Sequence, residues 1–153
     1  MDGSCRGERQ LDLELDGERS ALFAPKAASS LILLDTNALL WLDRGHPRCR
    51  ALARWAGRLY ISPASLLEIQ ILAEAGRIRL RPGTTPAVLA DDVRWLLDSP
   101  RANAWFETAL ALSWTRDPFD RLLVAHARTR GWRLATADAA LLARLGSNGS
   151  LEI

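Results

Sequence analysis

Several short apolar runs in this chain end at polar residues and have the length of β-strands. Residues 31–34 are four consecutive apolar residues, and Asp35 follows them. A short run with no polar residue predicts a strand that is buried on both faces of a sheet. Residues 59–61 and 132–136 predict two more strands, and residues 151–153 predict a further strand at an edge of the sheet.

Longer segments with helix start and stop signals separate these runs. Ser62 before Pro63 is a favoured helix beginning, as is Asp117 before Pro118, and Gly76 is a favoured residue after a helix end. The expected helices span residues 37–43, 47–57, 63–75, 84–99, 118–130 and 138–145. Strands that alternate with helices predict an α/β fold with a mainly parallel sheet. Residues 77–81 suggest a short extended piece, and residues 101–116 give no clear pattern.

Residues 1–30 differ from the rest, and we expect them to form a loosely held N-terminal extension of a single domain at residues 31–153. Leu11, Leu13 and Leu15 alternate with acidic residues, which predicts a short strand, and small residues at 25–30 predict a linker. An upstream start codon would also explain this segment.

The composition is that of an ordinary soluble globular protein. The chain has 153 residues, of which 48% are hydrophobic and 25% charged, and this length favours one domain. No apolar run approaches the roughly 20 residues that a membrane-spanning helix needs. Residues 11–19 are acidic where a signal peptide would be apolar. We therefore expect a cytoplasmic protein without a membrane partner.

Cysteine and histidine give no sign of a zinc site or of a disulfide framework. The two cysteines, Cys5 and Cys49, do not have the spacing of a metal-binding pair, and His46 and His126 are isolated. Two free thiols in a reducing compartment are expected.

The distribution of charge is more informative than the total of +2. Residues 31–153 carry twelve acidic and sixteen basic residues, and every one of those bases is arginine. If some of the acids bind a metal, the remaining surface is distinctly basic, and arginine suits phosphate because its planar group can donate two hydrogen bonds at once. A genome rich in G and C would also favour arginine, so the charge alone does not identify a partner.

Two carboxylates follow predicted strands directly. Asp35 follows residues 31–34, and Asp138 follows residues 132–136. Ligands of open α/β sheets bind beyond the carboxyl ends of the strands, which makes both positions suitable for a cation. Each acid could equally cap the helix that comes next.

A third carboxylate, Glu68, lies within the expected helix at residues 63–75. Its neighbours at helical spacing are Ala64, Ser65, Ile71 and Leu72, which are small or mostly apolar. A glutamate on such a face is costly to bury unless it is paired or binds metal. A partly exposed position at the edge of the face is the alternative.

Asp117 and Asp120 share the start of one helix, and spacing alone does not choose between them as a ligand. One of them is needed as a cap, which Asp117 suits, and the helix dipole favours Asp120 in the first turn whatever its function. An oxygen-only ligand set suits Mg²⁺ or Mn²⁺ rather than zinc.

Four segments in this order and spacing resemble the successive motifs of PIN domains, and most of all VapC-like toxins of bacterial type II toxin–antitoxin pairs. They are LILLDTN at 31–37, SPASLLEIQILAEAGR at 62–77, DPFDRLLVAHA at 117–127 and LATAD at 134–138. The resemblance implies a three-layer α/β/α fold around a mainly parallel sheet. The extension at residues 1–30 departs from these toxins, which usually begin close to the first strand.

The resemblance also assigns the site. Asp35, Glu68, Asp120 and Asp138 match the four acids that hold one or two Mg²⁺ or Mn²⁺ ions. Asp117 then remains a cap with a supporting role. Thr36, Asn37 and Thr136 match polar positions near the metal. Candidates for contact with the RNA backbone are Arg77, Arg79, Arg81 and Arg121.

The function that follows is a metal-dependent endoribonuclease that hydrolyses RNA phosphodiester bonds as the toxin of a toxin–antitoxin pair. The resemblance further implies a homodimer and a cognate antitoxin protein that covers the active site. Trp41 and Trp55 lie on helices that such proteins use for partner contact, although a helical tryptophan is more often part of the core.

Other classes of protein fit less well. A receiver-type phospho-acceptor needs a lysine near a later strand end, and the only lysine is Lys26. A dehalogenase-type phosphatase needs an aspartate where Asn37 stands. A catalytically inactive PIN scaffold that binds RNA or protein is the main alternative, and a DNA-directed or ribosome-associated PIN nuclease is another.

Overall fold

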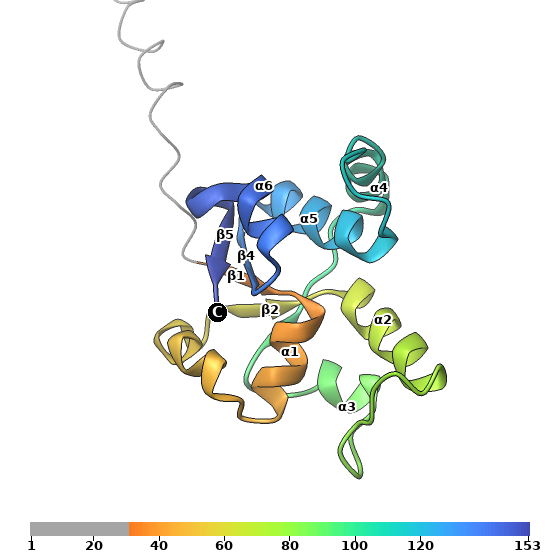
Figure 1. Ribbon diagram of the computed structural model, residues 1–153, viewed down its shortest axis with the longest axis vertical. Coiled ribbons are helices and arrows are strands. Elements are labelled where there is room, and N and C mark those ends of the chain that lie inside the picture. The colour runs from red at the N-terminus through yellow and green to blue at the C-terminus, as the bar shows by residue number, and fades with distance from the viewer. Residues whose placement is uncertain (1–30) are drawn as a thin grey trace, which may run out of the picture.

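We describe residues 31–153 from a computed structural model of the chain (Figure 1). The strand and linker predicted within residues 1–30 lie outside the described residues. No helix between residues 31 and 153 is both long and apolar enough to cross a membrane.

Five parallel strands form the central sheet, which confirms the predicted fold class. Their order is β3-β2-β1-β4-β5. The strands are β1 (Ile32–Leu34), β2 (Leu59–Ile61), β3 (Leu96–Leu97), β4 (Arg133–Thr136) and β5 (Ser150–Glu152). All four pairings are parallel. The carboxyl ends of all the strands therefore meet along one edge of the sheet.

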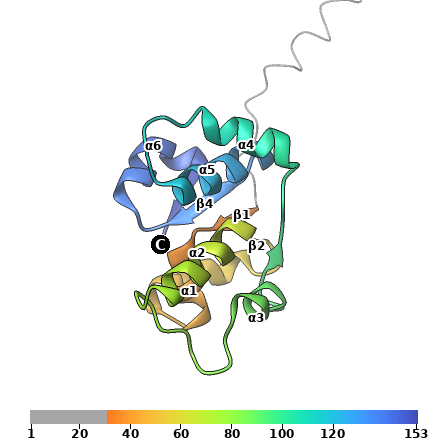
Figure 2. The same cartoon turned by 90° about the vertical axis from the view of Figure 1, so that its right-hand side faces the viewer.

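Helices cover both faces of this sheet, as Figures 1 and 2 show. One layer contains α1 (Thr36–Asp43), the 3₁₀ helix η2 (Pro47–Trp55), α2 (Pro63–Glu74) and α3 (Pro86–Ala90). The other contains α4 (Ala102–Leu110), α5 (Pro118–Arg130) and α6 (Ala139–Gly149). The start signals at Ser62 and Asp117 are confirmed, because both residues cap the helices that follow them.

The central strand β1 contributes to two cores, because successive side chains of a strand point to opposite faces. Ile32 and Leu34 pack in the first core with α1, η2 and α2, and Leu33 packs in the second with α4, α5 and α6. All three side chains are completely buried. This explains why the strand has no polar residue before Asp35.

The helix predicted at residues 84–99 is wrong. Helix α3 ends at Ala90, and Leu96–Leu97 form the edge strand β3 beside β2. The buried indole of Trp95 donates a 2.6 Å hydrogen bond to the carbonyl of Leu89. In a continuing helix that carbonyl would accept the backbone N–H of Val93 instead, so burial of Trp95 replaces helix with a turn and strand.

Smaller differences occur at four other places. Residues 77–81 form no strand, and residues 101–116, which gave no pattern, contain α4. The segment after Pro47 is a 3₁₀ helix rather than an α-helix. The last helix runs beyond residue 145, but Gly146 interrupts it with a φ of 64°, a conformation that favours glycine.

Ion pairs between a buried carboxylate and two partly exposed arginines close the first layer at the end of α1. The Asp43 carboxylate is buried and accepts bonds of 3.0 and 2.6 Å from Arg81 and one of 3.2 Å from Arg94. We expect Asp43→Ala to lower the free energy of unfolding by about 2 kcal/mol, because hydrogen bonds to charged groups are lost. Urea denaturation measures this. The exposed Glu74→Ala is the control, and an Asp43→Ala midpoint equal to that of the control would contradict the prediction.

Candidate functional site

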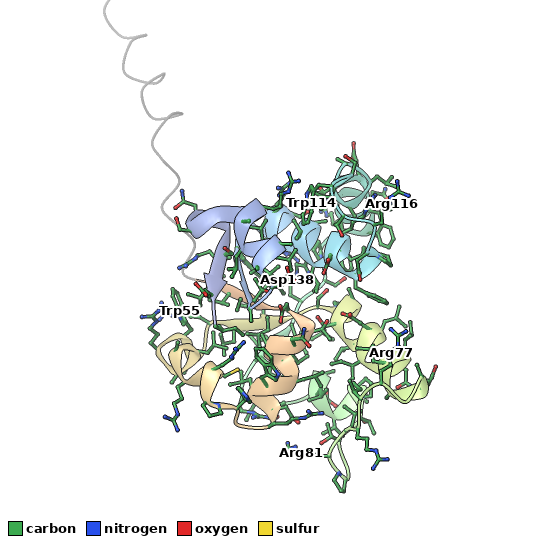
Figure 3. The ribbon with its side chains drawn as sticks, in the orientation of Figure 1. Trp55, Arg77, Arg81, Trp114, Arg116 and Asp138 are labelled. Atoms are coloured by element: carbon green, nitrogen blue, oxygen red, sulfur yellow. The ribbon has the colours of Figure 1, made fainter. Side chains whose placement is uncertain are left out.

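The four predicted acids gather at the carboxyl edge of the sheet. Asp35 directly follows β1 and Asp138 lies two residues after β4, whereas Glu68 comes from α2 and Asp120 from the first turn of α5. Strands β1 and β4 are paired, and the backbone N–H of Asp35 donates a 3.0 Å bond to the carbonyl of Ala135. Figure 3 labels Asp138 at this edge, between the two helical layers. The site thus receives side chains from both layers.

Asp35 is the most enclosed of these acids, with 5% of its surface exposed. It caps α1, and its Oδ1 accepts the backbone N–H of Ala38 at 2.5 Å. Burial raises the pKa of its carboxyl, and the charge of Asp138 raises it further, while hydrogen bonds from Thr136 and Ala38 act in the opposite direction. Asp35 is therefore both a helix cap and a buried acid whose negative charge is poorly compensated by its surroundings.

Thr36 and Thr136 hold the acids in place. The Thr36 hydroxyl donates a hydrogen bond to Glu68 Oε2, which joins α1 to α2. The Thr136 hydroxyl is completely buried, bonds to Asp35 and accepts the backbone N–H of Asp138 at 3.0 Å. These contacts support the two threonines as neighbours of the site. Asn37 is exposed, and its backbone N–H is bonded to Asp35.

Glu68 is half-buried, which lies between the two alternatives of a buried position on an apolar face and a partly exposed position at its edge. Burial raises the pKa of its carboxyl, and the charges of Asp117 and Asp35 add to the effect. The hydrogen bond from Thr36 opposes them. A proton is consequently held more tightly by Glu68 than by an exposed glutamate.

Asp120 and Asp117 have different surroundings, which the sequence alone could not separate. Asp117 is exposed and caps α5 with Oδ1, which accepts the N–H groups of Phe119 at 2.8 Å and Asp120 at 3.1 Å. The pKa of Asp120 is raised to about 6 by burial, and then by the charges of Asp117, Asp138 and Glu68. Asp120 is thus a half-buried acid on which three other carboxylates act, whereas Asp117 is an exposed cap whose charge acts on Asp120 and Glu68.

Asp138 caps α6 and is exposed. Its Oδ1 accepts the N–H groups of Ala140 at 2.8 Å and Leu141 at 2.9 Å. Because both bonds go to one oxygen, capping does not consume the second. The same is true of Asp35, whose cap bond also goes to Oδ1. Each residue can therefore cap its helix and still present an oxygen to a cation.

The electrostatics of this cluster fit a divalent cation. The charges that shift the pKa of Asp35, Glu68 and Asp120 are all carboxylates, and all raise it. A cation would relieve this repulsion. Within residues 31–153, however, no three acidic, histidine or cysteine side chains are close enough to form a complete ligand set. A hard ion such as Mg²⁺ keeps several waters and binds through one or two carboxylates, so this spacing is compatible with it.

The arginines proposed to contact RNA are placed differently from one another. Arg77 and Arg79 are exposed. The guanidinium of Arg81 is held by Asp43, and Arg121 donates a 2.7 Å bond to the carbonyl of Thr115 in the loop before α5. Sequence reasoning missed Thr115, whose hydroxyl lies 3.5 Å from Asp120 Oδ2. It comes from the segment where no pattern was visible.

Trp41 and Trp55 both pack partly buried against the first core. Arg48 lies over the ring of Trp41, and Arg58 lies 4.8 Å from the ring centre of Trp55. Figure 3 shows Trp55 on the side of the molecule opposite Arg77. These contacts favour the interpretation of both tryptophans as core residues.

Comparisons with known proteins agree with this geometry. The PIN domain family model matches residues 32–147. Ribonuclease VapC22 of Mycobacterium tuberculosis is 35% identical over 118 residues, which cover 72% of this chain and 88% of that protein. A toxin–antitoxin complex from Klebsiella pneumoniae has a TM-score of 0.58 at 23% identity, with 80% of this chain and 99% of that chain covered. VapBC2 from Rickettsia felis, bound to a DNA fragment, has the same TM-score at 18% identity, with coverages of 80% and 98%.

Proposed function

The chain belongs to the PIN-domain family, and from this membership we propose that it is a metal-dependent endoribonuclease and the toxin of a toxin–antitoxin pair. One observation carries the proposal most directly. Burial, and then the charges of nearby carboxylates, raise the pKa of Asp35, Glu68 and Asp120 at one edge of the sheet, which costs stability unless a cation is bound. The relative named as a ribonuclease supports RNA as the substrate.

Asp35, Glu68, Asp120 and Asp138 would hold one or two Mg²⁺ or Mn²⁺ ions. Such an ion makes a water molecule more acidic and stabilises negative charge on a phosphodiester. Asp35 and Asp120 would be the principal ligands, because Asp35 is the most buried of the four acids and the charges of three other carboxylates act on Asp120. Asp138 would complete a second position.

Glu68 would orient the attacking water. Its carboxylate is fixed by Thr36 on one oxygen, and its raised pKa makes it a better proton acceptor than an ordinary glutamate. Asp117 would support the site by capping α5 and through its charge, which raises the pKa of Glu68 and Asp120. Arg77 and Arg79, which are exposed, and Arg121 would contact the RNA backbone.

We propose an antitoxin protein and a second copy of this chain as partners. Structural neighbours include toxin–antitoxin complexes. Large apolar side chains are also exposed on helices beside the acids, namely Leu67 and Ile71 on α2 and Phe106 and Leu110 on α4. Exposed apolar surface of this kind is typical of protein interfaces. An antitoxin that covers it would also restrict access to the acids.

A direct test is cleavage of a labelled pool of tRNA and rRNA by the purified, antitoxin-free protein. We expect discrete fragments with Mg²⁺ or Mn²⁺, loss of all cleavage with EDTA, and recovery when metal is added back. Cleavage that persists in EDTA would contradict the metal requirement. A folded protein that cuts no RNA with either metal would favour the inactive scaffold, which binds RNA or protein without catalysis.

A further inference from the structure

His126 lies at the centre of a polar network that the proposed chemistry does not use. Its side chain is completely buried. Nδ1 lies 3.1 Å from Ser62 Oγ, and Nε2 lies 2.8 Å from Asp98 Oδ2. The rings of Trp105 and Trp132 enclose it, with centroids 5.4 and 5.9 Å away. A polar ring in such a place needs both nitrogens satisfied.

The hydrogen bonds of this network have a single consistent direction. Asp98 only accepts, and it already accepts two 2.8 Å bonds from Arg130, so Nε2 of His126 carries the proton. Nδ1 then accepts from the Ser62 hydroxyl, whose oxygen in turn accepts the backbone N–H of Ala64 at 3.2 Å. Burial lowers the pKa of His126, which keeps the ring neutral. The ring is thus a fixed connection between Ser62 and Asp98.

Serine, histidine and aspartate in this order resemble a hydrolase triad, but Ser62 cannot act as one. Its side chain is completely buried. Its oxygen also caps α2, so no substrate carbonyl or phosphate can approach it. The network therefore has a structural role within the fold and does not contact a substrate.

The network connects α2 with α5, and each of these helices carries one of the acids. Ser62 begins α2, and Glu68 lies six residues later in that helix. His126 lies six residues after Asp120 in α5. Six helical residues correspond to about 9 Å, so the Ser62–His126 bond joins the two helices at similar distances from the two acids. The two acids come from opposite layers, and this bond connects those layers directly.

We propose that His126 is a positioning residue that fixes α2 against α5 through Ser62 and thereby sets the separation of Glu68 and Asp120 for metal binding. The inference rests on the proposed function, because it assumes that these two acids share a cation. Asp98 and Arg130 hold the ring in the orientation that presents Nδ1 to Ser62. Loss of the Ser62 bond would let the helices shift, and the acids would bind the ion less well.

Two substitutions of similar size at His126 distinguish the effects of the two hydrogen bonds that the ring makes. In His126→Asn, the amide oxygen can replace Nδ1 and accept from Ser62. In His126→Gln, the amide N–H can replace Nε2 and donate to Asp98, whereas the Ser62 bond is lost. By isothermal titration with Mn²⁺, we expect His126→Gln to weaken binding about tenfold, in line with other residues that support metal ligands. His126→Asn should remain closer to the wild-type protein than to His126→Gln.

The control is Val124→Ala, which truncates a completely buried side chain of the same helix that takes no part in the hydrogen bonds of the network. It should lower stability but leave Mn²⁺ affinity within about twofold. Ser62→Ala should weaken Mn²⁺ binding as His126→Gln does, and the two changes together should cost no more than either alone. Ser62→Ala compared with Val124→Ala still tests the Ser62–His126 bond if a His126 variant fails to fold.

Several outcomes overturn the inference. Equal Mn²⁺ affinities for wild type, His126→Gln and Ser62→Ala would do so while leaving the proposed function intact. Equal weakening by His126→Asn, His126→Gln and Val124→Ala would show that the ring only fills space. A wild-type protein that binds no Mn²⁺ and cuts no RNA would overturn both the inference and the proposed function.

Discussion

Asp35→Asn is expected to reduce RNA cleavage by more than about a hundredfold while the protein stays folded. Changes to residues that only support metal ligands already cost about 10- to 100-fold, so loss of a principal ligand should cost more. The fold should survive because asparagine is as good a helix cap as aspartate and can still accept the N–H of Ala38. Asp120→Asn is expected to have an effect of the same order.

The metal-free stability of the same variant gives an independent readout. Asp35 is buried, and the charge of Asp138 raises its pKa. A neutral asparagine removes that unfavourable charge, so the metal-free Asp35→Asn protein should unfold at a higher urea concentration than wild type at pH 7. Added Mn²⁺ should stabilise wild type more than the variant, because binding to the native state raises stability.

Glu74→Gln is the matched control for these measurements. Glu74 is exposed on α2 and bonds only along the helix surface, to Gln70 at 2.6 Å. The Glu74→Gln protein should cleave RNA like wild type and show the same Mn²⁺-induced stabilisation. Full cleavage by Asp35→Asn, with the purity of the preparation established, would remove Asp35 from the site. Equal loss in Glu74→Gln would point to a general effect of surface charge.

Much of the fold could be predicted because local signals and burial agree in most elements. The run at residues 31–34 has no polar residue, and the structure places this strand at the centre of the sheet. Ser62 with Pro63, and Asp117 with Pro118, mark helix starts that depend only on the neighbouring backbone. The parallel sheet then follows from the alternation of strands and helices.

The errors occur where a distant contact decides the local structure. Residues 84–99 have the composition of a helix, but Trp95 is buried against Leu89 and the next two residues pair with β2. Neither contact has a local signal. The missed strand also hid Asp98, a further carboxylate at a strand end, which pairs with Arg130 and accepts a hydrogen bond from His126.

The candidate site was accessible to sequence reasoning for a related reason. Strand ends and helix faces place Asp35, Glu68 and Asp138 without knowledge of distant contacts, whereas Asp117 and Asp120 needed the family resemblance. The structure now gives a physical difference between those two, since Asp117 is exposed, whereas Asp120 is half-buried and its pKa is raised to about 6. The contact of Thr36 with Glu68 spans 32 residues and has no signature in the sequence.

Metal-free protein is expected to lose stability as the pH rises from about 4 to about 7, because of Asp120. Its folded pKa is about 6, against 3.8 for an unperturbed aspartate. A raised pKa means that the folded state binds the proton more tightly, so the stabilisation is complete below 3.8 and is lost through 6. The shift corresponds to about 3 kcal/mol, which solvent screening of this partly exposed group reduces to about 1–2 kcal/mol.

The measurement is the difference between wild type and Asp120→Asn in urea denaturation at several pH values. The difference isolates the contribution of Asp120 from that of His126. Because the pKa of His126 is lowered, its contribution makes stability rise as the pH passes the ordinary pKa of histidine. Wild type should lose stability relative to Asp120→Asn across this range. A difference that does not change with pH would show that Asp120 is an ordinary surface acid.

Metal binding should release the proton that the folded protein holds on Asp120. At pH 5.5 the folded protein holds a proton on Asp120 that a cation must displace, so binding should release protons and apparent Mn²⁺ affinity should rise between pH 5 and 7. Titration calorimetry in two buffers of different ionisation enthalpy counts the protons released. Asp120→Asn should release fewer at pH 5.5, whatever its remaining affinity. Proton release that is the same in both proteins would mean that Asp120 does not face the bound ion, even if its loss abolishes cleavage.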